Sequence, residues 1–156
     1  MNYWWTSDYH FSHFNIIRYC NRPFETAEEM NETIIRKHNE RVQPEDTVFF
    51  LGDFIFIQGN HDNNNSLKTI ITKMYIYYGS KTICMTHKPE HADPKVPLNF
   101  CGHVHDRYKI KRLSDDSLIV NFSVDVWNYY PVSFNQINSC VAEFLRQEKE
   151  QINWVI

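Results

Sequence analysis

Histidine and acidic side chains recur at short spacing in five separate stretches of the sequence. They are Asp8-Tyr9-His10, Gly52-Asp53, Gly59-Asn60-His61-Asp62, His87 and Gly102-His103-Val104-His105. Carboxylate, imidazole and amide groups are the ligands that hard and borderline divalent cations prefer in proteins. No cysteine belongs to any of these stretches, which argues against a structural zinc site. The residue types therefore predict a site for divalent metal ions.

The position of these stretches is more specific than their composition, because a lone histidine is more often a core or surface residue than a ligand. Each stretch follows a short apolar run that is typical of a β-strand. In α/β sheets, sites form beyond the carboxyl ends of the strands, so we expect the five stretches to converge. If the backbone there is extended, Asp8 and His10 point to one face, and so do His103 and His105. The apolar runs are residues 3–6, 47–51, 55–58, 82–86 and 98–101.

Local patterns predict the remaining elements. Residues 26–38 form a helix, with Thr26 and Glu29 as a capping box, and the continuous apolar run at 47–51 indicates a strand buried on both faces. Strands and helices in alternation predict an α/β layered fold. The other predicted elements are a hairpin of residues 74–78 and 82–86, a pair of strands at 108–111 and 118–124, a short helix at 66–71, and a last helix at 133–149 with Ser133 and Gln136 as a second capping box.

Length and charge narrow the function classes. The 156 residues predict a single domain, residues 1–156. A net charge of −3 offers no basic surface, so nucleic acid is not favoured as a partner. No apolar run is long enough to span a membrane and no secretion signal is evident, so we expect a cytoplasmic protein without a membrane partner.

The ordered set of stretches resembles the calcineurin-like metallophosphoesterase superfamily. Residues 8–17, 21–24 and 51–54 are similar to a small single-domain bacterial and phage branch of it. The resemblance covers nearly the whole chain and implies a four-layer α/β/β/α sandwich. It also implies two divalent metal ions, which the ligand types restrict to manganese, iron, zinc, nickel or cobalt.

Carried over position by position, the resemblance implies a role for each residue. Asp53 would bridge the two ions. His61 would be an acid that does not bind metal, and Asp62 would orient it. The ligands of the first ion would be Asp8, His10 and His105, and those of the second Asn60, His87 and His103.

Contacts to the substrate are predicted at His13, Asn15 and Arg22, which follow the first motif. The predicted function is hydrolysis of a small phosphate ester, either a monoester or a diester, by a metal-activated water. Two alternatives stay open: a phosphoesterase fold that has lost catalysis and serves as an interaction scaffold, and a nuclease. The oligomeric state is also open.

One connection departs from the family pattern. Only residues 54–58 separate Asp53 from Gly59, where a helix-containing crossover is expected. Parallel strands need a connection of a dozen or more residues. A segment is missing here, or the link is a shortened crossover that passes over the top of the sheet, or the second metal site is altered. We favour a missing segment, because residues 54–56 and 56–58 look like two joined ends.

Overall fold

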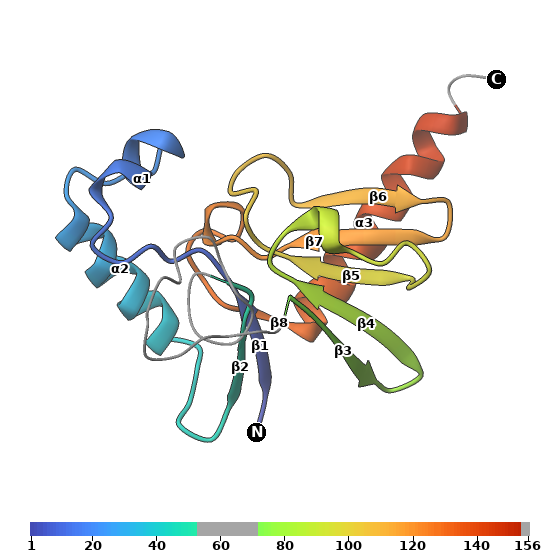
Figure 1. The fold of residues 1–156 in the computed structure, drawn as a ribbon, viewed down its shortest axis with the longest axis horizontal. Coiled ribbons are helices and arrows are strands. Elements are labelled where there is room, and N and C mark those ends of the chain that lie inside the picture. Colours follow the sequence, from blue (N-terminus) through green and yellow to red (C-terminus); the bar gives the residue numbers. More distant parts are fainter. Residues whose placement is uncertain (53–71, 154–156) are drawn as a thin grey trace.

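The structure is a computed structural model that describes residues 1–52 and 72–153. Two β-sheets lie side by side at the centre, and helices flank them (Figure 1). Helices α1 (Phe14–Tyr19) and α2 (Ala27–Asn39) lie beside the smaller sheet. Helix α3 (Phe134–Asn153) runs along the larger sheet. The predicted α/β class is confirmed.

The smaller sheet has the strand order β2-β1-β8 among the described residues. Its strands β1 and β2 are parallel, and β8 is antiparallel to β1. The side chains of β2 are half-buried, so the prediction of a strand buried on both faces was wrong. The strands are β1 (Tyr3–Thr6), β2 (Thr47–Phe50) and β8 (Val132–Ser133).

The larger sheet has the order β3-β4-β5-β7-β6. Its three central strands are parallel, and an antiparallel strand lies at each edge. Both predicted strand pairs are confirmed, and the second begins at Ile110 rather than Tyr108. The strands are β3 (Lys73–Tyr78), β4 (Lys81–Thr86), β5 (Leu98–Cys101), β6 (Ile110–Ser114) and β7 (Ser117–Asn121).

The ends of the helices follow the predicted capping signals. The hydroxyl of Thr26 accepts a hydrogen bond from the backbone N–H of Glu29 at 3.1 Å, and α2 begins at the next residue after Thr26. At the start of α3, the Oε1 of Gln136 accepts a hydrogen bond from the backbone N–H of Ser133 at 3.0 Å. Helix α1 has no counterpart in the sequence-based expectations. Two short 3-10 helices complete the described elements, η1 (Pro89–His91) and η2 (Val124–Val126).

One aromatic core joins the two sheets. Trp5 of β1 is fully buried, and its ring centroid lies 5.7 Å from that of Phe100 in β5 and 5.9 Å from that of Phe134 in α3. A second apolar cluster lies under α1 and α2 and includes Met30 and Ile34. The shared core fixes the end of β1 against the end of β5, which is where the site residues follow.

Several expectations concern residues that lie outside the described ranges. They are the strand at 55–58, the helix at 66–71 and the connection between residues 53 and 59. Within 1–52 and 72–153, every helix is too short or too polar to cross a lipid bilayer.

The shared core predicts a large loss of stability when Phe100 is truncated. Phe100→Ala should lower the free energy of unfolding by about 3–5 kcal/mol, because the cavity lies between both sheets and cannot collapse fully. Urea denaturation followed by tryptophan fluorescence measures this change. Tyr77→Ala is the control, since its side chain is 81% exposed and should change the value by less than about 0.5 kcal/mol. Equal effects of the two substitutions would contradict the assignment of the core.

Candidate metal centre

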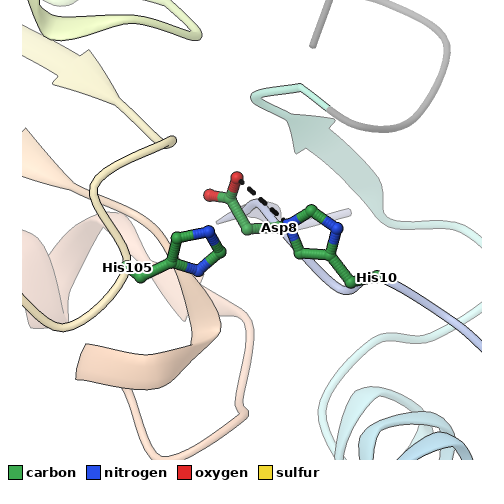
Figure 2. Close-up of side chains that lie close together, drawn as sticks. All are labelled: Asp8, His10 and His105. Atoms are coloured by element: carbon green, nitrogen blue, oxygen red, sulfur yellow. Dashed lines mark ion pairs between the residues drawn. The ribbon is translucent and has the colours of Figure 1, made fainter. Parts of the chain in front are cut away.

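Strands from both sheets end at one place. Strand β1 of the smaller sheet leads into Asp8, and β5 of the larger sheet leads into His103 and His105. A parallel bridge between Ser7 and Ser123 ties the end of β1 to the segment that follows β7. Figure 2 shows the outcome: the Asp8 carboxylate lies between the rings of His10 and His105. The predicted convergence beyond the strand ends therefore holds for these residues.

Asp8 is fully buried, and its two oxygens have different surroundings. Its Oδ2 accepts hydrogen bonds from the hydroxyls of Ser7 at 2.5 Å and Ser123 at 2.7 Å, and from the backbone N–H of His103 at 3.0 Å. Its Oδ1 accepts no hydrogen bond from any residue that the structure describes. A buried carboxylate oxygen without a hydrogen bond costs free energy, so a cation at Oδ1 would be stabilising.

His10 and His105 place further ligand atoms beside this oxygen. The Nε2 of His10 is 4.0 Å from Oδ1 of Asp8. One ligand atom each from Asp8, His10 and His105 lies within 4.8 Å of the other two. One carboxylate and two imidazoles at this spacing suit a borderline divalent cation. These are the residues that the resemblance implies for the first metal ion.

The orientation of the His105 ring is set by Asp125. Its Nδ1 lies 3.0 Å from Oδ2 of Asp125, whose carboxylate can only accept. Burial disfavours the charged form of His105, but the bond to Asp125 outweighs it and raises the pKa of His105 to about 10. Burial likewise opposes ionisation of Asp125, and hydrogen bonds from His105 and Arg22 nevertheless lower its pKa. Because Nδ1–H is held by Asp125, a cation would bind at Nε2 and take the place of the second ring proton.

His87 and His103, which are implied as ligands of the second ion, lie next to each other. The Nδ1 of His103 is 3.2 Å from Nε2 of His87, and Nδ1 of His87 is 2.9 Å from the carbonyl oxygen of Leu51. Burial, followed by the neighbouring His87, lowers the pKa of His103. A low pKa keeps this imidazole neutral, which is the form that binds metal. The backbone bond from His103 to Asp8 links this pair to the first cluster.

The backbone around the site is left-handed rather than extended. The φ angles of Asp8, His10, His103 and His105 are +57°, +55°, +71° and +47°. The condition of an extended backbone is therefore not met, because the chain turns sharply after each strand. Residues other than glycine seldom adopt positive φ, and such positions concentrate at functional sites.

Some predicted site residues cannot be placed. Asp53, Asn60, His61 and Asp62 lie outside the residues that the structure describes. They include the predicted bridging ligand and the predicted acid. Their roles stay predictions.

A cavity of about 320 Å³ opens beside the cluster. His13 lines it, whereas Asn15 is exposed on α1 and is not among its lining residues. Arg22 has a fully buried side chain that contacts Asp125. The cavity is lined by His10, His13, Ile16, Tyr19, Cys20, His103, Val104, His105, Asp106 and Arg107. Of the three predicted substrate contacts, only His13 therefore faces this cavity.

Asp125 is the main site residue that sequence reasoning missed. It follows strand β7 by a few residues, so the same rule that selected Asp8 and His103 could have found it. Cys20, His105 and Asp125 also have ligand atoms within 4.8 Å of one another. However, both oxygens of Asp125 already accept hydrogen bonds from Arg22, at 2.8 and 3.0 Å. The guanidinium charge makes this second trio a poor site for a cation.

The close packing around Asp8 predicts that Gly102→Ala damages the site. A Cβ at this position would lie 2.6 Å from Oγ of Ser7 and 2.7 Å from Oδ2 of Asp8, which must then move. The expected result is an affinity for Mn²⁺ that is weaker by about 10- to 100-fold, the cost typical of disturbing the partners of a metal ligand. Isothermal titration calorimetry measures the affinity.

Gly79→Ala is the control for Gly102→Ala. Gly79 has a positive φ, +61°, and its added Cβ would meet nothing within 4 Å. It should lower the melting temperature through backbone strain and leave the Mn²⁺ affinity unchanged. The assignment of the site would be wrong if the two variants bound Mn²⁺ equally well.

Comparison with known proteins finds proteins that are similar to most of this chain. No family model matches the chain. The uncharacterized protein MJ1445 of Methanocaldococcus jannaschii is 36% identical over 159 positions, which cover 84% of this chain and 86% of the relative. The crystal structure of AQ665, a protein of unknown function from Aquifex aeolicus, superposes with a TM-score of 0.72 at 23% identity and covers 89% of this chain and 98% of its own.

A more remote likeness is to a crystal structure of a Vps29 single mutant from Entamoeba histolytica. Its TM-score is 0.46 at 16% identity, and it covers 78% of this chain and 73% of its own. The AQ665 structure supports the fold alone. The identity to MJ1445 over most of both sequences shows that this chain belongs to the same protein family as MJ1445 of Methanocaldococcus jannaschii.

Proposed function

We propose that this protein is a metal-dependent phosphoesterase that hydrolyses a small phosphate ester. The observation that carries the proposal is the cluster of Asp8, His10 and His105, whose ligand atoms lie within 4.8 Å of one another where the two sheets meet. The buried Oδ1 of Asp8, which accepts no hydrogen bond from the described residues, supports a cation at this position. The resemblance of the motifs to metallophosphoesterases adds the reaction class.

We infer that the donor set would hold two divalent ions. Asp8, His10 and His105 would hold the first. His87 and His103 would contribute to the second, together with Asn60, and Asp53 would bridge the two. When bound, the ions would supply Lewis acidity that neutralises phosphoryl charge and activates a water.

The side chains of the protein would perform the remaining tasks. His61 would donate a proton to the leaving oxygen, and Asp62 would hold its ring in position. The cavity beside the cluster has a volume of about 320 Å³, which suits a small ester. His13 on its wall and Arg107 at its exposed rim would bind phosphoryl oxygens or the leaving group.

Metal removal tests the proposal directly. Treatment with EDTA should abolish hydrolysis of an aryl phosphomonoester or diester, and added Mn²⁺ should restore it. His105→Ala should lower both Mn²⁺ affinity and turnover, because it removes one of three ligands. His91→Ala is the control, since this histidine on η1 is exposed and belongs neither to the ligand cluster nor to the lining of the cavity. Activity that resists EDTA would overturn the metal requirement. Hydrolysis of DNA or RNA but of no small ester would favour the nuclease.

The proposed acid role predicts a different outcome for His61→Ala. This variant should bind Mn²⁺ as the wild type does and lose activity by about 10²- to 10⁴-fold, the usual contribution of a general acid. Steady-state kinetics and calorimetry on the same preparation separate the two quantities. A loss of Mn²⁺ binding in this variant would show that His61 is a ligand instead.

A further inference from the structure

Arg22 and Asp125 form a buried ion pair behind the metal cluster. Their side chains are 0% and 3% exposed. Nε of Arg22 donates to Oδ1 of Asp125 at 2.8 Å, and its Nη2 donates to Oδ2 at 3.0 Å. This two-pronged contact joins residues 103 positions apart in the sequence. A guanidinium held in this way has a fixed orientation, so its other N–H groups point in defined directions.

The remaining donors of Arg22 reach the turn that carries Asp8 and His10. Nη2 donates to the carbonyl oxygen of Asp8 at 2.8 Å, and Nη1 donates to that of Tyr9 at 3.0 Å. Asp8 and His10 both have positive φ, a conformation that needs support from its surroundings. Arg22 supplies part of that support, because it binds two successive carbonyl groups in the turn.

Asp125 acts in the same way on the other side of the cluster. Its Oδ2 accepts hydrogen bonds from Nδ1–H of His105 and from Nη2–H of Arg22. The bond fixes both the tautomer and the rotation of the His105 ring. A carboxylate bonded to the distal nitrogen of a metal-binding histidine typically has this effect.

From these contacts we propose that Arg22 and Asp125 are positioning residues for the metal centre. The pair fixes the position of the Asp8–His10 turn relative to the His105 ring, so that their ligand atoms face one cation. This inference rests on the proposed metal-dependent function. It assigns Arg22 a role in the architecture of the site rather than in contact with the substrate.

The test uses Asp125→Asn and Arg22→Lys in the full chain. Asparagine preserves the shape of aspartate but loses its charge, and lysine preserves the charge of arginine but cannot bridge a carboxylate and two carbonyl groups. Each variant should bind Mn²⁺ about 10- to 100-fold more weakly than the wild type in calorimetry. The visible absorption spectrum of bound Co²⁺ should also change, because it reports ligand geometry.

A more exposed arginine–carboxylate pair on other elements provides controls for the chemical change. Arg112 of β6 donates to Glu148 of α3 through Nε at 3.0 Å and also through Nη2. Arg112→Lys and Glu148→Gln make the same chemical changes far from the site. They should leave the Mn²⁺ affinity and the Co²⁺ spectrum as in the wild type.

A third readout follows His105 without metal or substrate. At about pH 11, above the raised pKa of His105, ¹⁵N-edited NMR of the wild type should show the one remaining ring proton of His105 on Nδ1. In Asp125→Asn, the tautomer should shift toward Nε2–H or become mixed. If Asp125→Asn proves unstable, Arg22→Lys alone decides, by Mn²⁺ affinity and by the Co²⁺ spectrum.

The outcomes separate the two proposals. Variants with wild-type Mn²⁺ affinity, Co²⁺ spectrum and His105 tautomer would overturn the positioning role and leave the phosphoesterase proposal standing. A wild type that binds Mn²⁺ but hydrolyses no phosphate ester, with weakened binding in both variants, would overturn the phosphoesterase and support the positioning role. A wild type that binds no divalent cation would overturn both.

Discussion

The burial of one carboxylate governs the arrangement of this protein's candidate site. Asp8 is shielded from water, so each of its oxygens must find a partner within the fold. Three donors from three segments satisfy Oδ2, namely Ser7, Ser123 and the backbone of His103. These contacts tie the end of the smaller sheet to two segments that follow strands of the larger one. They also leave Oδ1 directed toward the imidazoles, with its charge uncompensated by hydrogen bonds from the described residues.

Much of the fold could be predicted because its signals are local. The Thr26 cap fixes where α2 begins, and the Gly79-Ser80 turn fixes the first hairpin. The rule that functional residues follow parallel strands found Asp8, His103 and His105 without knowledge of the sheet order. Contacts over long sequence separations have no such signal. Arg22 was therefore expected at the substrate, while its actual partner, Asp125, lies 103 positions away. The left-handed turns were missed for a similar reason, since the surrounding fold imposes them against the intrinsic preference of histidine and aspartate.

The connection after Asp53 is shorter than the resemblance to the metallophosphoesterase superfamily implies. The match to MJ1445 is 159 positions long, yet 84% of 156 residues is about 131, so about 28 positions of the match have no residue of this chain. A length of this order is enough for a complete strand–helix–strand crossover. The matched part of MJ1445 therefore contains residues that have no counterpart in the present sequence. The ligands implied on either side of that connection, Asp53 and Asn60, are the ones whose geometry depends on it.

The hydrogen bonds around Asp8 also bear on how the protein acquires its site. They link residues 95 and 115 positions apart, so the ligand cluster forms only after both sheets have docked. Non-local contacts of this kind form in slow folding steps, because the chain loses the entropy of closing large loops before the contacts stabilise it. A cation that recognises the assembled cluster has no equivalent site in the unfolded chain. Bound metal would therefore stabilise the folded protein, and the free energy of unfolding would rise with the logarithm of the metal concentration.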